Sequence, residues 1–349
     1  MKRMLPVALA LLLWGACRKI QDGQTTITTF QESGLDVSWD RSGSNRIAFS
    51  KKGSDGYYDI YTALPDGSHE TCLTCNNPAL PNKHICCPSW HPGGHWIIFL
   101  AEKSTHPGSS TDALPGFGAY CDIWLMNDSA TKFYKLIDLP ADADHGVISP
   151  HFSPDGRHIE WTNRKKQPDL LNAKGQAGFW NICIAPFHFD SLGLPVVGVT
   201  QTIEPGEDAF NECYGYAPDG SKLIFCSCIG QNSFWDEHIY TIDTLGGHLT
   251  RLTDKDYNEH AFYTPDGGRI CWMSNTNSKK GGTDWWMMNA DGNHKQQITF
   301  FNEPRHSQYA GHAVWAGLGS FSPDGSRFVG GVQQSLITQE GKIVLVQLN

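Results

Sequence analysis

The sequence predicts an all-β fold, a six-bladed β-propeller of four-stranded antiparallel blades. Three observations lead to this prediction. A strand–turn–strand unit recurs six times, at spacings of 47 to 64 residues. Further strand-like stretches follow each unit, so that a full repeat accounts for four strands. The sixth repeat stops one strand short, and a strand-like stretch at residues 25–30 has no hairpin before it. Repeats of this length are typical of closed or stacked arrays of one structural unit.

The repeat is clearest in SPDGRHIEW at residues 153–161. Pro154 presets the φ angle for a tight turn, and Gly156 supplies the left-handed conformation after Asp155. The residues after the turn are apolar, as expected for a buried strand. Four copies contain Pro-Asp-Gly and the first two are degenerate; together they occupy residues 40–49, 91–99, 153–161, 217–225, 264–272 and 322–330.

A third strand follows each hairpin, and a fourth strand follows in five repeats. The third strands are expected at residues 59–64, 122–127, 180–185, 238–243, 284–289 and 342–347. The fourth strands are expected at residues 70–74, 133–137, 196–200, 249–253 and 296–300. The stretch 25–30 then supplies the missing strand, so that the ring is closed by the N-terminal strand pairing with the last blade. Closure removes the exposed sheet edges of an open array.

These motifs resemble the repeats of the TolB-like propeller family. The shared pattern is an aromatic residue, Pro-Asp-Gly, an apolar pair, then Asp-Ile-Tyr or Asp-Ile-Trp, and finally Leu-Thr. The resemblance covers residues 25–349 and implies a propeller in an exported protein. TolB, a periplasmic protein of the Tol–Pal system, carries an α/β domain before its propeller, and we expect no such domain here. The resemblance therefore does not extend to the Pal-binding role.

The first residues have the features of a targeting segment. Lys2 and Arg3 precede an apolar stretch at residues 5–14, and small residues stand before Cys17. We therefore expect residues 1–17 to be a signal peptide of the lipoprotein type, with Cys17 as the lipidated residue and 18–24 as a tether. An ordinary signal peptide cut nearby is the alternative. We expect an exported protein, periplasmic or at the cell surface, anchored by lipid to a bacterial membrane.

Composition restricts the partners. The formal net charge is −9 and the one short basic run is 164–166, which argues against nucleic acid, because phosphate binding requires clustered Lys and Arg. No second apolar stretch is long enough to span a bilayer, so membrane contact is expected through the lipid anchor alone. The common nucleophile, zinc-protease and nucleotide motifs are absent from the sequence. We expect a monomer.

Loop lengths distinguish the two faces of the predicted ring. The Pro-Asp-Gly turns are short, whereas the fourth-to-first connections and two second-to-third insertions, 103–120 and 164–178, are long. Long loops on a rigid scaffold usually carry binding sites, so we expect the ligand on this face. Phe117, Tyr120 and Tyr309 in these loops are candidate platforms for a sugar or peptide.

Polar residues gather where the long connections enter the innermost strands. Those that precede the turn proline position by five to eleven residues are His84, His145, Asn211, Glu212, Asn258, Glu259, His260 and His312. His306 is a further candidate in the last long loop. His and carboxylate side chains together suit a divalent metal ion or acid–base chemistry, and the candidate ligands are Glu212, Glu259, His260 and His312. The alternative is that these side chains only bond to water and neighbouring loops.

Two functions follow from these features. The first is a non-catalytic binding or scaffolding module for a protein or glycan of the cell envelope. The second is a metal-dependent carbohydrate-active enzyme with its site at the mouth of the channel. Oligogalacturonide lyases resemble this sequence in having propeller repeats and a metal site of His and Gln, and His306, Gln308 and His312 offer those residue types. Fold does not decide between the two functions.

Four cysteines bracket one long loop: Cys72, Cys75, Cys86 and Cys87. A disulfide that staples the loop, from Cys75 to Cys86 or Cys87, is expected in an oxidising compartment. A zinc site that includes His84 is the alternative. Cys72 and Cys75 are not expected to bridge each other, because three residues of extended chain span roughly 10 Å.

Overall fold

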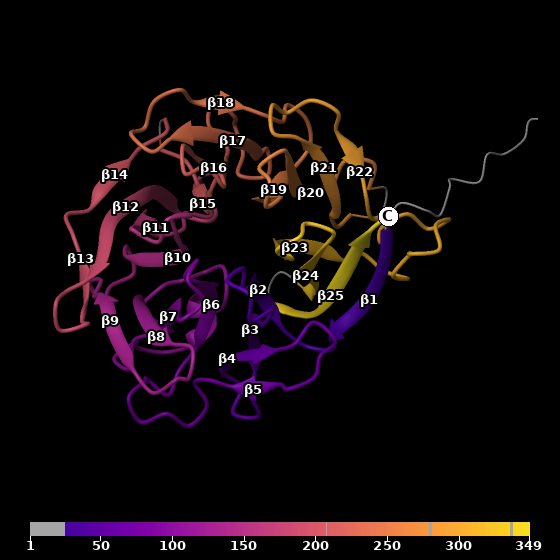
Figure 1. The fold of residues 1–349 in the computed structure, drawn as a ribbon. Coiled ribbons are helices and arrows are strands. Elements are labelled where there is room, and N and C mark those ends of the chain that lie inside the picture. Colours follow the sequence, from indigo (N-terminus) through magenta and orange to yellow (C-terminus); the bar gives the residue numbers. More distant parts are fainter. Residues whose placement is uncertain (1–24, 207, 279–280, 336–337) are drawn as a thin grey trace, which may run out of the picture.

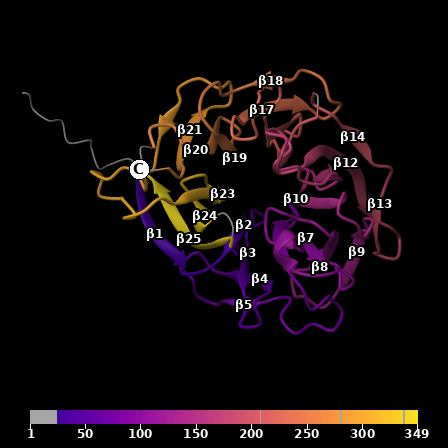
Figure 2. The same cartoon turned by 180° about the vertical axis from the view of Figure 1, so that it is seen from behind.

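The computed structural model describes residues 25–349 except 207, 279–280 and 336–337. Its strands form six antiparallel sheets arranged as blades around a central axis (Figures 1 and 2). The predicted six-bladed propeller is confirmed. A short 3-10 helix, η1 (Ser110–Ala113), lies in a loop of the second blade. In the described part of the chain, no helix is long and apolar enough to cross a membrane.

In each blade the strands follow one another from the axis outward. Blade one contains β2 (Leu35–Trp39), β3 (Ile47–Lys52), β4 (Tyr58–Ala63) and β5 (Thr71–Cys72). Blade two contains β6 (Ile85–Trp90), β7 (Trp96–Glu102), β8 (Cys121–Asn127) and β9 (Phe133–Ile137). Blade three contains β10 (Gly146–Phe152), β11 (His158–Lys166), β12 (Phe179–Phe189), β13 (Pro195–Val197) and β14 (Gln201–Ile203).

The remaining blades repeat this order. Blade four contains β15 (Asn211–Tyr216), β16 (Lys222–Ser227), β17 (His238–Asp243) and β18 (Thr250–Arg251). Blade five contains β19 (Asn258–Tyr263), β20 (Arg269–Ser274), β21 (Asp284–Asn289) and β22 (Gln296–Gln297). Blade six contains β23 (Trp315–Phe321), β24 (Arg327–Ser335), β25 (Glu340–Leu348) and β1 (Thr25–Gln31).

The N-terminal strand closes the ring. β1 pairs with β25 in antiparallel register, with Thr25 opposite Leu348, so the two ends of the propeller lie in one blade (Figure 1). Phe30 anchors this strand, because its ring is buried and meets Phe49 of the first blade edge-on at 5.6 Å. The predicted closure is therefore confirmed, and it covers the edge of β25 that an open ring would expose.

The Pro-Asp-Gly turns form as the sequence predicts. Gly156 has a φ angle of 70°, and Asp155 accepts a hydrogen bond from the backbone N–H of Arg157 at 3.0 Å. The same aspartate bond closes the turns of the last three blades. These short turns lie on one face of the ring. The second-to-third and fourth-to-first connections lie on the opposite face, which we call the long-loop face, because antiparallel strands alternate in direction.

The core lies mainly between neighbouring blades, where apolar strands of one sheet face those of the next. Trp285 illustrates this packing: its indole is buried, donates a hydrogen bond to the Gly317 carbonyl at 2.9 Å and packs against Phe328. Gly330 lets this ring approach, because a Cβ there would clash with it. Tight packing of this kind makes the ring a rigid support for the loops.

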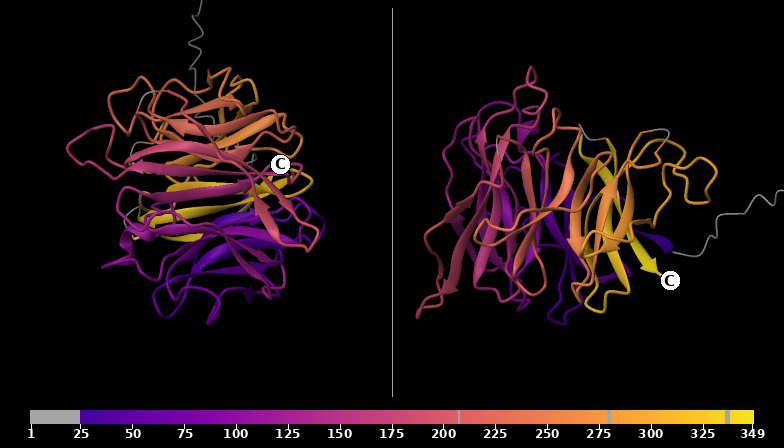
Figure 3. Two further views of the ribbon diagram at one scale, coloured as in Figure 1. Left: turned by 90° about the vertical axis from the view of Figure 1, so that its left-hand side faces the viewer. Right: turned by 90° about the horizontal axis from the view of Figure 1, so that it is seen from above.

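Blade three departs from the expected pattern. Residues 196–200 were expected to form its fourth strand, but this position is taken by β14, which pairs with Ile182 to Ile184 of β12. The prediction is wrong because β12 continues four residues beyond its expected end and pairs there with β13. The resulting β12–β13 hairpin protrudes from the ring (Figure 3).

Every innermost strand contains a β-bulge. The pairing register shifts once in each of the six first hairpins. In four of these strands, the residue five positions before the turn proline position has a left-handed backbone: Asp36 (φ 47°), Cys87 (φ 55°), Ser149 (φ 52°) and His260 (φ 52°). Left-handed conformations are uncommon for residues other than glycine and tend to mark functional sites. Here the bulges re-aim side chains near the axis.

Candidate functional site

The largest of the cavities described here opens on the long-loop face. It has a volume of about 1060 Å³ and its walls come from the long loops of blades two to five. We call it the central cavity. Its aromatic wall residues are Phe117, Trp180, Phe210, Phe234, Trp235 and Tyr257, and its polar floor residues are Asp36, Glu212, Glu259 and His260. A concave site with apolar walls and a few convergent polar groups is the usual form of a ligand site.

Three side chains meet at the floor: Glu212 from β15, and Glu259 and His260 from β19. One potential ligand atom of each lies within 4.8 Å of the other two. The Nδ1 atom of His260 is 3.8 Å from Oε2 of Glu259. Ser149 donates a hydrogen bond to Oε1 of Glu212 at 2.7 Å, and Tyr257 donates one to Oε2 of Glu259 at 2.7 Å. The floor therefore presents two oriented carboxylates and an imidazole.

A second acidic group lies behind this floor. Glu237 is completely buried, and its Oε2 accepts a hydrogen bond from the Cys226 thiol at 3.1 Å. Potential ligand atoms of Cys226, Glu237 and Glu259 lie within 4.8 Å of one another. The Tyr214 hydroxyl connects the two groups, since it is 3.1 Å from Oε2 of Glu212 and 3.0 Å from the Cys226 sulfur. The carboxylates form one continuous buried cluster.

Burial sets the ionisation of this cluster. It raises the pKa of Glu212 to about 7 against the opposing effect of His260, and the charge of Glu259 adds to the rise. Burial also raises the pKa of Glu259 to about 7. The pKa of Glu237 lies well above its ordinary value because of burial and the charge of Glu259, whereas burial lowers the pKa of His260. Burial thus shifts each group toward its uncharged form when no cation is near.

The aromatic wall is a connected set of rings. Phe234 lies 5.3 Å from Phe210 and 5.1 Å from Trp235, and Trp235 lies 5.5 Å from Tyr257, measured between ring centroids. Trp235 is 50% exposed, so one of these rings is open to solvent. The buried Arg164 guanidinium lies over the Trp180 ring at 5.4 Å, which adds a cation to the wall. An aromatic ring open to solvent beside polar groups suits a ligand with both apolar faces and hydroxyls.

A second cavity occupies the opposite half of the channel. It has a volume of about 440 Å³, is lined by residues near the Pro-Asp-Gly turns and shares Asp36 and Leu318 with the central cavity. Asp36 lies 3.5 Å from the Cys87 sulfur and accepts a hydrogen bond from Ser50 at 3.1 Å. The two cavities therefore meet at the bulged residues near the axis.

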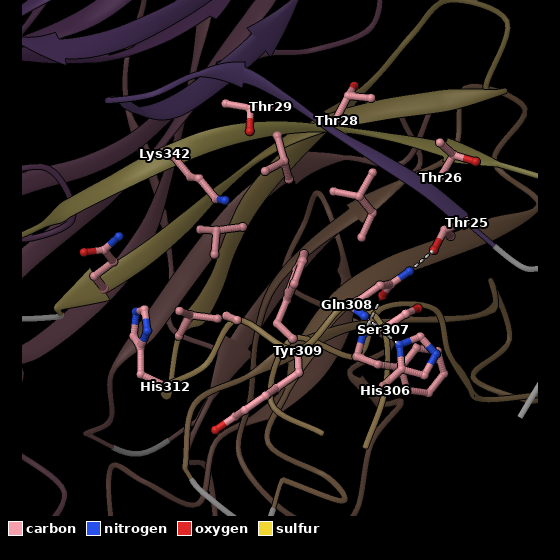
Figure 4. A pocket seen from close by; sticks show the side chains of 18 residues that line it. Thr25, Thr26, Thr28, Thr29, His306, Ser307, Gln308, Tyr309, His312 and Lys342 are labelled. Atoms are coloured by element: carbon pink, nitrogen blue, oxygen red, sulfur yellow. Dashed lines mark hydrogen bonds between the residues drawn. The ribbon is translucent and has the colours of Figure 1, made fainter. Parts of the chain in front are cut away.

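A third pocket lies at the closure of the ring, and we call it the seam pocket (Figure 4). It has a volume of about 620 Å³ and is bounded by β1, β25 and the loop from Phe300 to Val314. Gln308 connects its walls, because its side chain donates to the Thr25 hydroxyl at 3.2 Å and accepts from the Phe300 amide at 2.9 Å. The His306 ring stacks on Phe300 at 4.2 Å. Polar groups of this pocket thus hold the loop against the blade.

The predicted site residues are divided among several places. Glu212, Glu259 and His260 come together in the central cavity, but His312 lines the seam pocket with His306. His145 lies on the surface and pairs with Asp142 at 2.6 Å. Of the four candidate metal ligands, His312 therefore lies apart from the other three, and the candidate ligand-binding residue His145 lies apart from them as well.

The remaining predicted residues take part in local hydrogen bonds. His84 is buried and accepts from the Tyr58 amide at 3.1 Å. Asn211 bonds to the Trp180 carbonyl at 2.8 Å, and Asn258 accepts from the Trp272 indole at 2.9 Å. These three side chains organise strands and loops.

Several residues of this region were not predicted. Asp36, Arg164 and Trp235 line the central cavity, and Cys226 and Glu237 lie in the acidic group behind its floor. Glu237 and Trp235 lie in the second-to-third connection of blade four, whereas the predicted polar residues lie where chains enter the first strands. An aromatic pair followed by acidic residues in that loop, FWDE at 234–237, is a signal that was available.

The cysteine prediction is wrong. Cys72 and Cys75 form a disulfide, whereas Cys86 and Cys87 are free thiols. The bridge is possible because β5 ends at Cys72, so that the chain turns and brings the two Cα atoms to 5.8 Å. A zinc site built on Cys72 and Cys75 is excluded by the same bond.

Comparisons with known proteins agree with the geometry. No protein-family model matches the chain, and no curated protein matches it. TolB from Acinetobacter baumannii is similar, with a TM-score of 0.55 and 19% identity over 88% of this chain, which spans 65% of that protein. A putative TolB from Agrobacterium tumefaciens has a TM-score of 0.54 and 14% identity, covering 93% of this chain and 98% of that one.

A solved oligogalacturonate lyase in complex with manganese is also similar. Its TM-score is 0.50 at 11% identity, covering 93% of this chain and 97% of that one. Identities this low establish the fold and leave function open. The six repeats, the closed ring and these similarities together show that the chain has the TolB-like six-bladed propeller fold.

Proposed function

We propose that the protein is an exported binding module of the cell envelope that holds a saccharide in the central cavity. The observation that carries the proposal is the combination of an aromatic wall, from Phe210 to Tyr257, with a floor of oriented carboxylates. Sugar rings have apolar faces that pack on aromatic rings, and their hydroxyls donate hydrogen bonds to carboxylates. The volume suits one or a few sugar units.

Export and envelope location are part of the proposal. The targeting features and Cys17 lie in residues outside the described part of the chain, so the lipid anchor rests on the sequence alone. The fold is shared with TolB, which supports a periplasmic or surface setting. The oligogalacturonate lyase among the similar structures supports a saccharide as the ligand class.

The test compares two exposed residues of blade four. Trp235→Ala removes the open ring of the wall, and Leu245→Ala removes an 83% exposed side chain on the opposite face. The mature protein is screened against envelope and plant-wall oligosaccharides by calorimetry. We expect Trp235→Ala to bind roughly fivefold more weakly and Leu245→Ala to bind unchanged, because loss of an aromatic contact costs on the order of 1 kcal/mol. Binding of no saccharide, or an equal effect of both variants, contradicts the proposal.

A metal-dependent carbohydrate-active enzyme is the second candidate. One observation favours it: Glu212, Glu259 and His260 converge at the floor beneath the wall. These residues would hold a divalent ion, which would supply Lewis acid chemistry, and a carboxylate that does not bind the ion would serve in proton transfer. The test incubates the protein with acidic and neutral oligosaccharides, with Mn²⁺ and with chelator, and analyses chain length. Metal-dependent shortening that Glu212→Gln abolishes supports the enzyme, and unchanged chains in every mixture support the binding module.

A further inference from the structure

We propose that the floor of the central cavity is a binding site for one divalent transition-metal ion, Mn²⁺ or Zn²⁺, held by Glu212, Glu259 and His260. The inference goes beyond the proposed function, because the ion is bound whether or not a saccharide is present. Two carboxylate oxygens and one imidazole nitrogen form the donor set, which suits these ions better than Ca²⁺ or Mg²⁺. The potential ligand atoms already lie within 4.8 Å of one another.

A buried polar group with no partner gives independent support. Glu237 has an exposed fraction of 0%, and its Oε1 atom has no hydrogen-bond partner in the described part of the chain. Its carboxylate faces the cluster, because it groups with Glu259 and Cys226 within 4.8 Å. The Nδ1 atom of His260 likewise has no hydrogen-bond partner there. Buried polar atoms are nearly always paired, and these two atoms lie where a cation held by the cluster would be their partner.

Charge balance points in the same direction. Glu212, Glu237 and Glu259 are each less than 10% exposed. None of the ion pairs found among the described residues joins any of the three to a lysine or arginine. The ionised form of a buried carboxylate is strongly unfavourable without a counter-charge, and a divalent cation would supply that charge within the cluster.

The surrounding residues orient the ligands. His260 occupies the left-handed position of the bulge in β19, with a φ angle of 52°. Tyr257 donates to Glu259, and Ser149 and Tyr214 donate to the two oxygens of Glu212. Hydrogen bonds from outside the coordination shell fix carboxylate ligands in this way in metal sites. The floor opens into the central cavity, so further coordination positions face the ligand space.

Two other groups are weaker candidates. Asp59, Cys72 and Cys75 also lie within 4.8 Å of one another, but the two sulfurs form a disulfide. Asp36, Cys86 and Cys87 lie within the same distance, and the carboxylate there accepts a hydrogen bond from Ser50. An ion bound by a thiolate gives a charge-transfer absorption band that an ion bound by carboxylates and imidazole does not, and the test uses this difference.

The test measures metal binding by the mature protein directly. The protein is stripped with chelator, dialysed and titrated with Mn²⁺ and with Zn²⁺ by calorimetry, and metal content is checked by elemental analysis. Glu259→Gln and His260→Gln each replace a carboxylate or imidazole ligand with a neutral amide, which binds these ions more weakly. Glu160→Gln is the matched control, because Glu160 is also completely buried with one unpaired oxygen but belongs to none of the potential metal-binding groups.

We expect one equivalent of metal in the wild type and in Glu160→Gln, and roughly 100-fold weaker binding in the other two variants. Absence of stoichiometric binding in the wild type, or equal affinity in all variants, overturns the proposal. A Co²⁺-loaded wild type adds a readout that needs no variant to fold. Ligand-field bands without thiolate charge transfer support the site, and a thiolate band overturns it. Saccharide binding by metal-free protein is measured separately, so each proposal stands or fails alone.

Discussion

The central cavity and the seam pocket contain similar residue types but use them differently. In the central cavity, Glu212, Glu259 and His260 face one another, and no lysine or arginine pairs with them among the described residues. In the seam pocket, Gln308 bonds to Thr25 and Phe300, and His306 stacks on Phe300. The polar groups of the central cavity converge on a shared space, whereas those of the seam pocket bond to the loop and to β1. Convergence, more than residue type, distinguishes a binding site.

Position along the repeat explains the difference. Glu212, Glu259 and His260 stand five or six residues before the turn proline, which places them in the bulged part of the innermost strand. His145 and His312 stand nine and eleven residues before it, outside the strands. The connection then carries them to the surface or to the seam. A window of five to eleven residues was therefore too wide, because only its first two positions reach the floor.

The largest expected effect is a loss of folding stability on substitution of one glycine in each of the two regions. Gly118 and Gly282 both have left-handed backbones, and a Cβ at either would clash with a carbonyl oxygen, that of Val147 or Val314. We expect Gly118→Ala and Gly282→Ala each to lower the free energy of unfolding by roughly 2–4 kcal/mol, measured by denaturant titration. The first distorts the loop that carries Phe117 into the central cavity, and the second distorts the base of the seam loop.

Ligand binding by the same two variants sharpens the comparison. Saccharide affinity is expected to fall in Gly118→Ala and to stay unchanged in Gly282→Ala, measured below the unfolding transition of both. The opposite result would move the ligand site to the seam pocket. An equal fall in both would mean that the two regions are not independent.

A pH effect of intermediate size is expected at the base of the seam loop. Burial raises the pKa of Asp284 to about 6, although the carboxylate accepts hydrogen bonds from the amides of Phe301 and Asn302 and from their neighbours. Between pH about 4 and 6 the folded protein therefore holds a proton on Asp284 that the unfolded chain has lost. The resulting contribution to the free energy of unfolding is fully present below pH about 4 and is lost as the pH rises through 6.

Asp284→Asn isolates this contribution. The difference in unfolding free energy between wild type and variant is expected to change by on the order of 2–3 kcal/mol between pH 4 and 6.5 and to be flat above that range. Denaturant titrations at a series of pH values measure it. A flat difference across the whole range would show that the carboxylate of Asp284 keeps its charge in the folded protein at every pH measured.

Most of the fold could be predicted from the sequence, because turn residues mark the first hairpin of each repeat. Asp155 and Gly156 fix one hairpin, and the same pair fixes three others. The continuation of β12 to Phe189 was missed, because an apolar run does not mark where a strand changes partners. The bulges were missed for a related reason. Asp36, Cys87, Ser149 and His260 share a backbone conformation but no side-chain chemistry, so no motif reveals them.

The candidate site was predictable only in part. Glu212 and Glu259 occupy equivalent positions of the repeat, and this equivalence indicated a shared location. Glu237 lies in the second-to-third connection of blade four, and the residues at the matching place in the other blades are not acidic, so periodicity gave no information about it. The Cys72–Cys75 disulfide was missed because the prediction treated both residues as extended chain. The strand β5 ends at Cys72, and the turn after it brings the two cysteines together.

The smallest expected effect concerns His312, which the sequence grouped with the metal ligands. The side chain is exposed and lines the seam pocket near one end of the loop, with Tyr309 between it and His306 (Figure 4). His312→Ala is therefore expected to change the unfolding free energy by less than about 0.5 kcal/mol and to leave metal affinity unchanged. Calorimetry with Mn²⁺ beside His260→Gln measures both. A loss of metal binding in His312→Ala equal to that in His260→Gln would require the seam loop to reach the floor of the central cavity. The distinction between the two regions would then be removed, because an exposed side chain eleven residues before the turn would act as a ligand.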